Sequence, residues 1–212
     1  MKFVVAHDTG NPGSTATGNV AYYERSRNEE SASAHIFVDD KEIIECIPAL
    51  TATPEKAWVD TDNHLFGVNA NAAAIGVEYC FGEHINADEA YRKYIWVIAY
   101  ICERFKLDPQ GSVVGHFFLD PKRKTDPVTG LAQSRRTYDQ LLRDIVLEYQ
   151  SCIISSGEAS AISASQWDFT AQAGTVVTIA KLNIRKDIPR RTADIVQEVP
   201  LGTRLDFVWM GY

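Results

Sequence analysis

Three side chains within a short stretch of this 212-residue chain could act on one substrate: His116, Lys124 and Asp126. Pro121 and Pro127 prevent a continuous helix across the stretch, which is therefore expected to be an irregular loop. Such a loop can fold an imidazole and a carboxylate back onto one point. Two ligands of this kind need a third from elsewhere to hold zinc and leave a fourth position for water.

The third ligand is expected from the N-terminus, because His7 ends an apolar run over residues 2–6 that has the composition of a buried strand. His116 likewise follows a short β-branched run, and Glu78 interrupts another apolar run at residues 74–80. Binding and catalytic sites are commonly built at the strand ends of an α/β sheet. His7, Glu78 and His116 are therefore predicted to meet at one edge of a sheet.

Together these side chains form a complete set for a metal-dependent hydrolase. Two imidazoles and a carboxylate can hold zinc, a second carboxylate can accept a proton, and an ammonium group can stabilise an oxyanion. Each also has a structural interpretation: a strand-end histidine can serve only as a hydrogen-bonding group, Asp126 can begin a turn and Lys124 can be solvated. Glu78 is the hardest to explain in this way, because an isolated carboxylate inside a sheet is costly unless it is paired or faces a cleft. The residues alone leave both interpretations open.

The elements that must position these residues alternate between strands and helices. Strands are expected at residues 2–6, 34–38, 43–47 and 74–80, and helices at residues 17–30 (with Thr17 as the N-cap), 89–106 and 136–150. Residues 48–71 show little periodicity, and so long a loop in a compact domain is usually functional. We therefore predict an α/β domain with a mixed central sheet flanked by helices.

The chain changes character after residue 152. A polar, serine-rich stretch over residues 153–170 is typical of a linker. Short β-rich runs then follow without any helical pattern, at residues 175–180, 182–185, 195–199 and 201–208. The predicted organisation is a first domain over residues 1–152, a linker over 153–170 and a small all-β module over 171–212.

Composition argues against two classes of partner. The net charge is −7. Residues from Glu158 onward hold six acidic and six basic side chains, so the whole excess of negative charge lies before residue 158. A first domain that is this acidic argues against nucleic acid as a partner. The longest apolar run, Tyr94–Cys102, is too short for membrane insertion, and the N-terminus lacks the apolar core of a signal peptide, so synthesis in the cytoplasm is expected.

The four scattered cysteines form no CxxC pair and are predicted to be buried free thiols. Nothing in the sequence indicates the oligomeric state.

The first domain also resembles a known family through four motifs in the same order. The motifs are Val4–Thr9, Ser33–Val38, Ala74–Glu78, and Gly115–His116 followed by Arg123–Pro127. They resemble the zinc-dependent N-acetylmuramoyl-L-alanine amidases, a family that includes phage endolysins and is related to peptidoglycan recognition proteins. The resemblance covers residues 1 to about 150.

This resemblance implies zinc bound by His7, His116 and Asp126, with Glu78 as general base and Lys124 as oxyanion stabiliser. The implied reaction is hydrolysis of the amide bond between N-acetylmuramic acid and L-alanine, which lyses the bacterial cell wall. The implied partner is therefore peptidoglycan.

The chain departs from the family pattern at two points. Some relatives have a tyrosine just before the residue matching His35, where this chain has Ala34, so the base role falls to Glu78. His35 itself could contact substrate or orient a zinc ligand. It could equally be a structural histidine whose hydrogen bonds are all made within the fold. The family often has glycine after Asp126-Pro127, where this chain has Val128, so the following loop is expected to differ.

Residues from about 175 resemble a bacterial SH3-like module through residues 180–185 and 199–203, which implies a small barrel that binds cell wall. The sequence stops at Tyr212, before the last strands of such a module, so either the chain is a shortened one or the module is incomplete. Two other functions remain open: peptidoglycan binding without catalysis, and zinc-dependent cleavage of another cell-wall amide. Without a signal peptide, the protein is expected to reach the wall only after its release from the cell.

Overall fold

The computed structural model describes residues 1–26, 33–59 and 66–155, together with the backbone of four strands between residues 172 and 209. The chain divides into two compact units, Met1–Glu158 and Ala159–Tyr212. The residues predicted to do chemistry all lie in the first unit.

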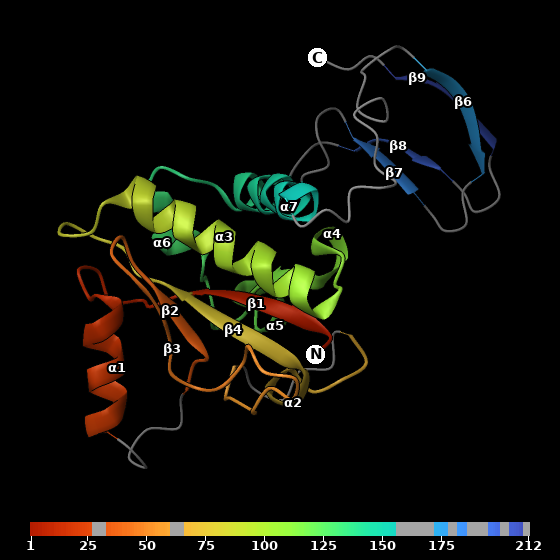
Figure 1. The fold of residues 1–212 in the computed structure, drawn as a ribbon. Helices are drawn as coiled ribbons and strands as arrows, with labels where there is room; N and C mark the ends of the chain where they lie inside the picture. Colours follow the sequence, from red (N-terminus) through yellow and green to blue (C-terminus); the bar gives the residue numbers. More distant parts are fainter. Residues whose placement is uncertain are drawn as a thin grey trace. The chain divides into compact units, whose positions relative to one another are not determined.

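The first unit is built on a five-stranded sheet (Figure 1). Its strands are β1 (Phe3–Asp8), β2 (Ile36–Val38), β3 (Ile43–Glu45), β4 (Ala74–Tyr79) and β5 (Val113–Gly115). The spatial order is β3-β2-β4-β1-β5, in which β3 runs antiparallel to β2 and all other neighbours are parallel. The predicted α/β domain with a mixed central sheet is confirmed.

Helices surround this sheet. They are α1 (Ala16–Arg25), α2 (Ala70–Ala73), α3 (Ala87–Phe105), α4 (Pro109–Ser112), α5 (His116–Leu119), α6 (Val128–Gln133) and α7 (Tyr138–Ser155). The long helix α3 crosses one face of the sheet, and α7 packs against α3 (Figure 1). In the part of the chain that the structure describes, no helix has the length and apolar character needed to cross a membrane.

Side-chain alternation along the strands decides which residues can form a site. In β1, Val4 and Ala6 belong to the large core beneath α3 and α7, whereas Val5 belongs to a smaller core on the opposite side. Because successive side chains of a strand point to opposite faces, His7 shares the face of Val5. The parallel ladder pairs His7 with Glu78 of β4, so both side chains point away from α3.

The first helix begins earlier than predicted. Its N-cap is Thr15, not Thr17: the Thr15 hydroxyl accepts the N–H of Gly18 at 3.1 Å. The N–H of Ala16 is bound at 2.8 Å by the carboxylate of Asp39, which is buried after β2. That carboxylate fixes the helix start from 23 positions further along the chain, so the local sequence gives no sign of it.

The loop expected around residues 115–127 contains regular structure. His116 begins α5, a single helical turn that ends before Pro121, and α6 begins just after Pro127. The prolines limit the length of a helix without excluding one turn between them. Elements of four to six residues carry too little periodicity to be predicted from sequence, and α2 and α4 were missed for the same reason.

The second unit contains strands, as predicted. Strand β6 (Gln172–Val177) pairs antiparallel with β9 (Arg204–Trp209), and β7 (Leu182–Arg185) pairs antiparallel with β8 (Ile195–Val199). These are two separate two-stranded sheets among the described residues, so the expected SH3-like barrel stays a prediction. The expected linker begins inside α7, which reaches Ser155; its other residues, 156–170, lie outside the described residues.

Three of the four cysteines can be compared with their prediction. Cys46, Cys80 and Cys102 are free thiols; Cys80 and Cys102 are buried and Cys46 is partly buried. Burial raises the pKa of the Cys102 thiol to about 12 and that of Cys46 to about 11. These thiols therefore stay protonated and unreactive near neutral pH. The Cys152 side chain lies outside the described residues.

Candidate metal centre and its cleft

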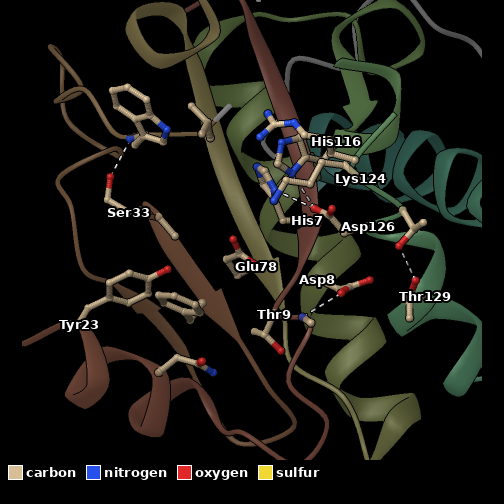
Figure 2. Close-up of a pocket in the computed structure, with 18 residues that line it drawn as sticks. His7, Asp8, Thr9, Tyr23, Ser33, Glu78, His116, Lys124, Asp126 and Thr129 are labelled. Atoms are coloured by element: carbon tan, nitrogen blue, oxygen red, sulfur yellow. Dashed lines mark hydrogen bonds and ion pairs between the residues drawn. The ribbon is translucent and has the colours of Figure 1, made fainter. Parts of the chain in front are cut away.

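Two imidazoles and one carboxylate converge on a single point. The Nδ1 atom of His7 lies 3.0 Å from Oδ2 of Asp126, and Nδ1 of His116 lies 2.9 Å from the same oxygen. The centroids of the two imidazole rings are 4.4 Å apart, and the ring planes are inclined at 72° to each other. The three side chains come from β1, α5 and the loop before α6, and they meet as predicted (Figure 2). We call His7, His116 and Asp126 the metal trio.

The sheet brings the two histidines together. Strands β1 and β5 are parallel, with Ala6 opposite Gly115, so the residues that follow, His7 and His116, lie at the same edge of the sheet. The hydroxyl of Tyr94 on α3 donates to the carbonyl of His7 at 2.9 Å and so holds the end of β1. The backbone on which the His7 ring stands is therefore fixed from the opposite side of the sheet.

The loop that carries Asp126 is closed by its own backbone. The N–H of Phe117 donates to the carbonyl of Asp126 at 3.1 Å, and the N–H of Gly115 donates to the hydroxyl of Tyr138 at 2.8 Å. A Cβ atom on Gly115 would lie 2.5 Å from the Phe117 ring and 3.0 Å from Cδ of Pro127, so only glycine fits. This packing places the carboxylate against both imidazoles.

The donor set fits a metal ion. A tetrahedral zinc site with metal–ligand bonds of about 2.0–2.1 Å has ligands about 3.3 Å apart, near the two separations within the metal trio. Burial lowers the pKa of His7, against the raising effect of Asp126, which favours the neutral imidazole that a metal requires. Burial alone would raise the pKa of Asp126, but its bonds to His116 and His7 outweigh this and hold the pKa below the usual range.

Glu78 lies beside the metal trio without belonging to it. The parallel ladder places it next to His7, and Figure 2 shows its carboxylate facing the cleft. Burial raises the pKa of Glu78 well above its ordinary range, and the negative charges of Asp126 and Asp8 raise it further. A carboxylate whose pKa is raised in this way accepts a proton more readily than an exposed one.

Lys124 supplies a positive charge at the same place. Its backbone N–H donates to the carbonyl of Asp120 at 2.9 Å, which folds the loop so that the side chain lines the cleft. The Lys124 charge contributes to lowering the pKa of both His7 and Glu78, although less than the larger effects named above. The ammonium group is therefore close enough to act on charge that forms between these two residues.

These residues line an open cleft of about 610 Å³. Figure 2 shows Glu78 at its centre, the metal trio and Lys124 on one side, and Tyr23 and Ser33 on the other. The cleft is far larger than a single amide group requires, and its volume lies within the usual range for sites that bind organic ligands.

His35, for which a substrate contact was predicted, lies apart from the cleft. The His35 side chain is fully buried and is not among the residues that line the cleft. The N–H of Gly76 donates to its Nδ1 atom at 3.0 Å, so Nε2 carries the proton and donates to the carbonyl of Glu55, also at 3.0 Å. Both ring nitrogens are used in joining β4 to the segment after β3, which matches the structural interpretation of this histidine.

Sequence reasoning missed one carboxylate. Asp8, directly after His7, is buried, and its two oxygens accept the N–H groups of Gly10 at 3.0 Å and Gly130 at 2.8 Å. Gly130 lies in α6, which begins just after the Asp126 loop. Asp8 therefore joins β1, which carries His7, to α6, which follows Asp126. The aspartate is visible in the sequence, but its partner lies 122 positions away.

Replacing Asp8 with asparagine is expected to weaken zinc binding by at most about tenfold to a hundredfold, the range for a group that bonds directly to a metal ligand, because Asp8 holds the backbone near the ligands. An amide nitrogen cannot accept a hydrogen bond, so one of the two N–H groups loses its acceptor and the hold on α6 is weakened. Competition with a chelator measures the affinity.

Asp39→Asn is the matched control, because Asp39 is also buried and accepts backbone N–H groups, from Ala16, Lys41 and Glu42. It should destabilise the fold and leave zinc affinity unchanged. An equal loss of affinity in both variants would contradict the role given to Asp8.

The first unit is similar to known proteins in sequence. Residues 1–129 match the family model for N-acetylmuramoyl-L-alanine amidase. The chain is 33% identical over 150 residues to N-acetylmuramoyl-L-alanine amidase BlyA of Bacillus subtilis, which covers 66% of this chain and 40% of that protein. It is 27% identical over 162 residues to protein Ami of Listeria monocytogenes, covering 70% of this chain and 16% of that protein. The chain thus spans less than half the length of these two relatives.

Solved structures share the fold. Hydrolase AmiA of Staphylococcus aureus, solved in complex with its ligand, is 25% identical, with a TM-score of 0.60 over 76% of this chain and 77% of that one. A mutant endolysin from Bacillus subtilis is 25% identical, with a TM-score of 0.54 over 68% of this chain and 84% of that one.

Proposed function

Because this chain belongs to the N-acetylmuramoyl-L-alanine amidase family, we propose that it hydrolyses the amide bond between N-acetylmuramic acid and L-alanine in peptidoglycan. One observation carries the proposal: the metal trio converges beside Glu78 and Lys124 in an open cleft. A metal site, a proton acceptor and a cation within one cleft are what amide hydrolysis requires.

The metal would be zinc, held by Nδ1 of His7, Nδ1 of His116 and a carboxylate oxygen of Asp126. Bound zinc lowers the pKa of its water from about 15.7 to about 7 and polarises a carbonyl. Burial favours the neutral imidazole of His7, and the lowered pKa of Asp126 keeps its carboxylate ionised; these are the protonation states that such ligands need.

Glu78 would carry the proton in both halves of the reaction. As water attacks the carbonyl carbon, its proton passes to the Glu78 carboxylate. The same proton then goes to the nitrogen of L-alanine as the carbon–nitrogen bond breaks, so that the amine leaves in its neutral form. The raised pKa of Glu78 suits the first step, because it makes the carboxylate a better proton acceptor than an ordinary carboxylate, and the protonated group can then return the proton.

Lys124 would stabilise the negative charge that develops on the carbonyl oxygen during attack. It lines the same cleft as Glu78, and Figure 2 shows it on the side of the cleft that holds the metal trio. Removing one such oxyanion donor costs about a hundredfold to a thousandfold in rate.

The test is mass spectrometry of purified peptidoglycan digested with the full chain. The proposal requires new N-terminal L-alanine together with unsubstituted muramic acid carboxyl groups. New termini elsewhere in the peptide would show instead a zinc peptidase acting on another cell-wall amide. Binding to peptidoglycan without any product would show a recognition protein without catalysis.

We also propose that residues 171–212 form a cell-wall-binding module and that the protein acts as a phage or prophage endolysin, made in the cytoplasm and reaching the wall after release. The separation of Ala159–Tyr212 as a compact β-containing unit supports a distinct role for it. Co-sedimentation with purified wall should show weaker binding by a fragment ending at Glu158 than by the full chain. Equal binding by both would contradict the module's role.

A further inference from the structure

The cleft has an aromatic wall, formed by Tyr23, Phe37 and Trp58. The centroids of the Tyr23 and Phe37 rings lie 5.6 Å apart; Phe37 is on β2, and Tyr23 is on α1, which packs against β2 and β3. The Trp58 side chain also lines the cleft and is 56% exposed. Leaving an indole in water is unfavourable, whereas a ligand that covers it would gain from the contact.

The backbone presents Trp58 from a fixed position. The backbone N–H of Trp58 donates to the hydroxyl of Ser33 at 2.6 Å, and the backbone N–H of Val59 donates to the side-chain oxygen of Asn71 at 2.8 Å. Val59 is buried against Gly76, where a Cβ atom would lie only 2.3 Å from the valine methyl group. The indole is thus exposed although its neighbour is anchored in the smaller core.

The opposite side of the cleft has different chemistry. Arg123, Lys124, Thr125 and Thr129 line it and offer positive charge and hydroxyl groups. We call these four residues the polar wall. Figure 2 shows the labelled members Lys124 and Thr129 on the side away from Tyr23 and Ser33, with Glu78 between the two sides. A ligand that fills the cleft therefore meets an apolar surface on one side of the reacting centre and a cationic one on the other.

The substrate of the proposed function has the same two-sided character. One side of its scissile amide carries a pyranose ring, whose C–H face packs well on an aromatic ring, and the other carries a peptide with carboxylate groups. We propose that the aromatic wall binds the N-acetylmuramic acid ring, with Trp58 as its main contact, and that the polar wall receives the peptide. This assignment rests on the proposed function and names the part of the substrate that each wall recognises.

A second tryptophan provides a matched control. Trp96 on α3 is also largely exposed, at 41%, but its ring is stacked on Tyr100, with centroids 5.5 Å apart and planes 9° apart. It does not line the cleft. Replacing Trp96 therefore removes an exposed indole of the same kind without touching the aromatic wall.

The experiment compares two substrates with the same amide bond. One is N-acetylmuramoyl-L-alanyl-D-isoglutamine, and the other is its analogue with a lactoyl group in place of the whole muramoyl group. Trp58→Ala should lower kcat/KM on the muramoyl substrate by about tenfold to a hundredfold, the range for a buried tryptophan contact. Most of the loss should be in KM. The lactoyl substrate should be cleaved as by the parent, Trp58→Tyr should retain most activity, and Trp96→Ala should match the parent on both substrates.

An equal loss on both substrates would overturn the assignment, because Trp58 would then not act through the sugar. Parental activity of Trp58→Ala on the muramoyl substrate would overturn it too. Calorimetric titration with the muramoyl dipeptide provides a measurement with little turnover when both proteins also carry Glu78→Gln: on this background, Trp58→Ala should bind about tenfold or more weakly than the protein with the parental Trp58. If the parent cleaves neither substrate, the proposed function fails, and equal binding by parent and variant in this titration would still refute the sugar contact.

Discussion

Replacing Glu78 with glutamine is expected to slow turnover by about a hundredfold to ten-thousandfold while the zinc content stays that of the parent. Glutamine keeps the size and hydrogen-bonding shape of the side chain but cannot accept the proton of the attacking water. Glu78 lies beside His7 without being part of the metal trio, so its replacement should leave the three ligands in place. Metal analysis and turnover should be measured on the same preparation.

Three outcomes of this experiment can be told apart. Loss of zinc together with rate would make Glu78 a metal ligand, and near-parental turnover would remove it from the mechanism. Only slow turnover with zinc retained fits a general base. Glu89→Gln is the control, because Glu89 is an exposed carboxylate on α3 that pairs with Arg92 outside the cleft, and this variant should match the parent.

The pH dependence of the activity provides a second test of the role of Glu78. A general base works in its ionised form, so activity should fall as the pH drops through the pKa of Glu78. Because burial and the neighbouring carboxylates raise that pKa, the fall should occur well above the ordinary value of 4.5. The residual activity of Glu78→Gln should lack this acidic limb.

Replacing His116 with alanine is expected to abolish both zinc binding and wall lysis. The substitution leaves His7 and Asp126 alone, and two ligands do not make a structural or catalytic zinc site. Zinc per chain after dialysis and the clearing of a wall suspension measure the two effects. His84→Ala is the control, since His84 is exposed and does not line the cleft. Full zinc occupancy in His116→Ala would refute the assignment.

Much of this site could be anticipated because parallel strands end at a common edge. His7 and Glu78 each interrupt or end an apolar run, and His116 follows one, so their types and positions predicted a meeting point that the structure shows. Asp126 was placed correctly by the prolines around it, although the loop proved to contain the helical turn α5.

The parts that could not be anticipated depend on contacts between distant segments. His35, like His7, is a histidine that adjoins an apolar run, and only its bonds to Gly76 and Glu55 distinguish a structural histidine from a ligand. Asp8 finds its partner 122 positions away. Trp58 lies in a segment without periodicity, where no pattern distinguishes an exposed indole that lines a cleft from one that does not.

The shared carboxylate oxygen of Asp126 also bears on folding. Its two imidazole partners lie 119 and 10 positions away in the sequence, so an ion bound by all three closes a loop that covers more than half of the chain. The unfolded chain keeps these groups apart and binds the ion weakly. At a free zinc concentration of one hundred times the dissociation constant, the folded state gains about 2.7 kcal/mol over the unfolded state. The concentration of free zinc would thus change the stability of the folded chain, independently of any reaction at the site.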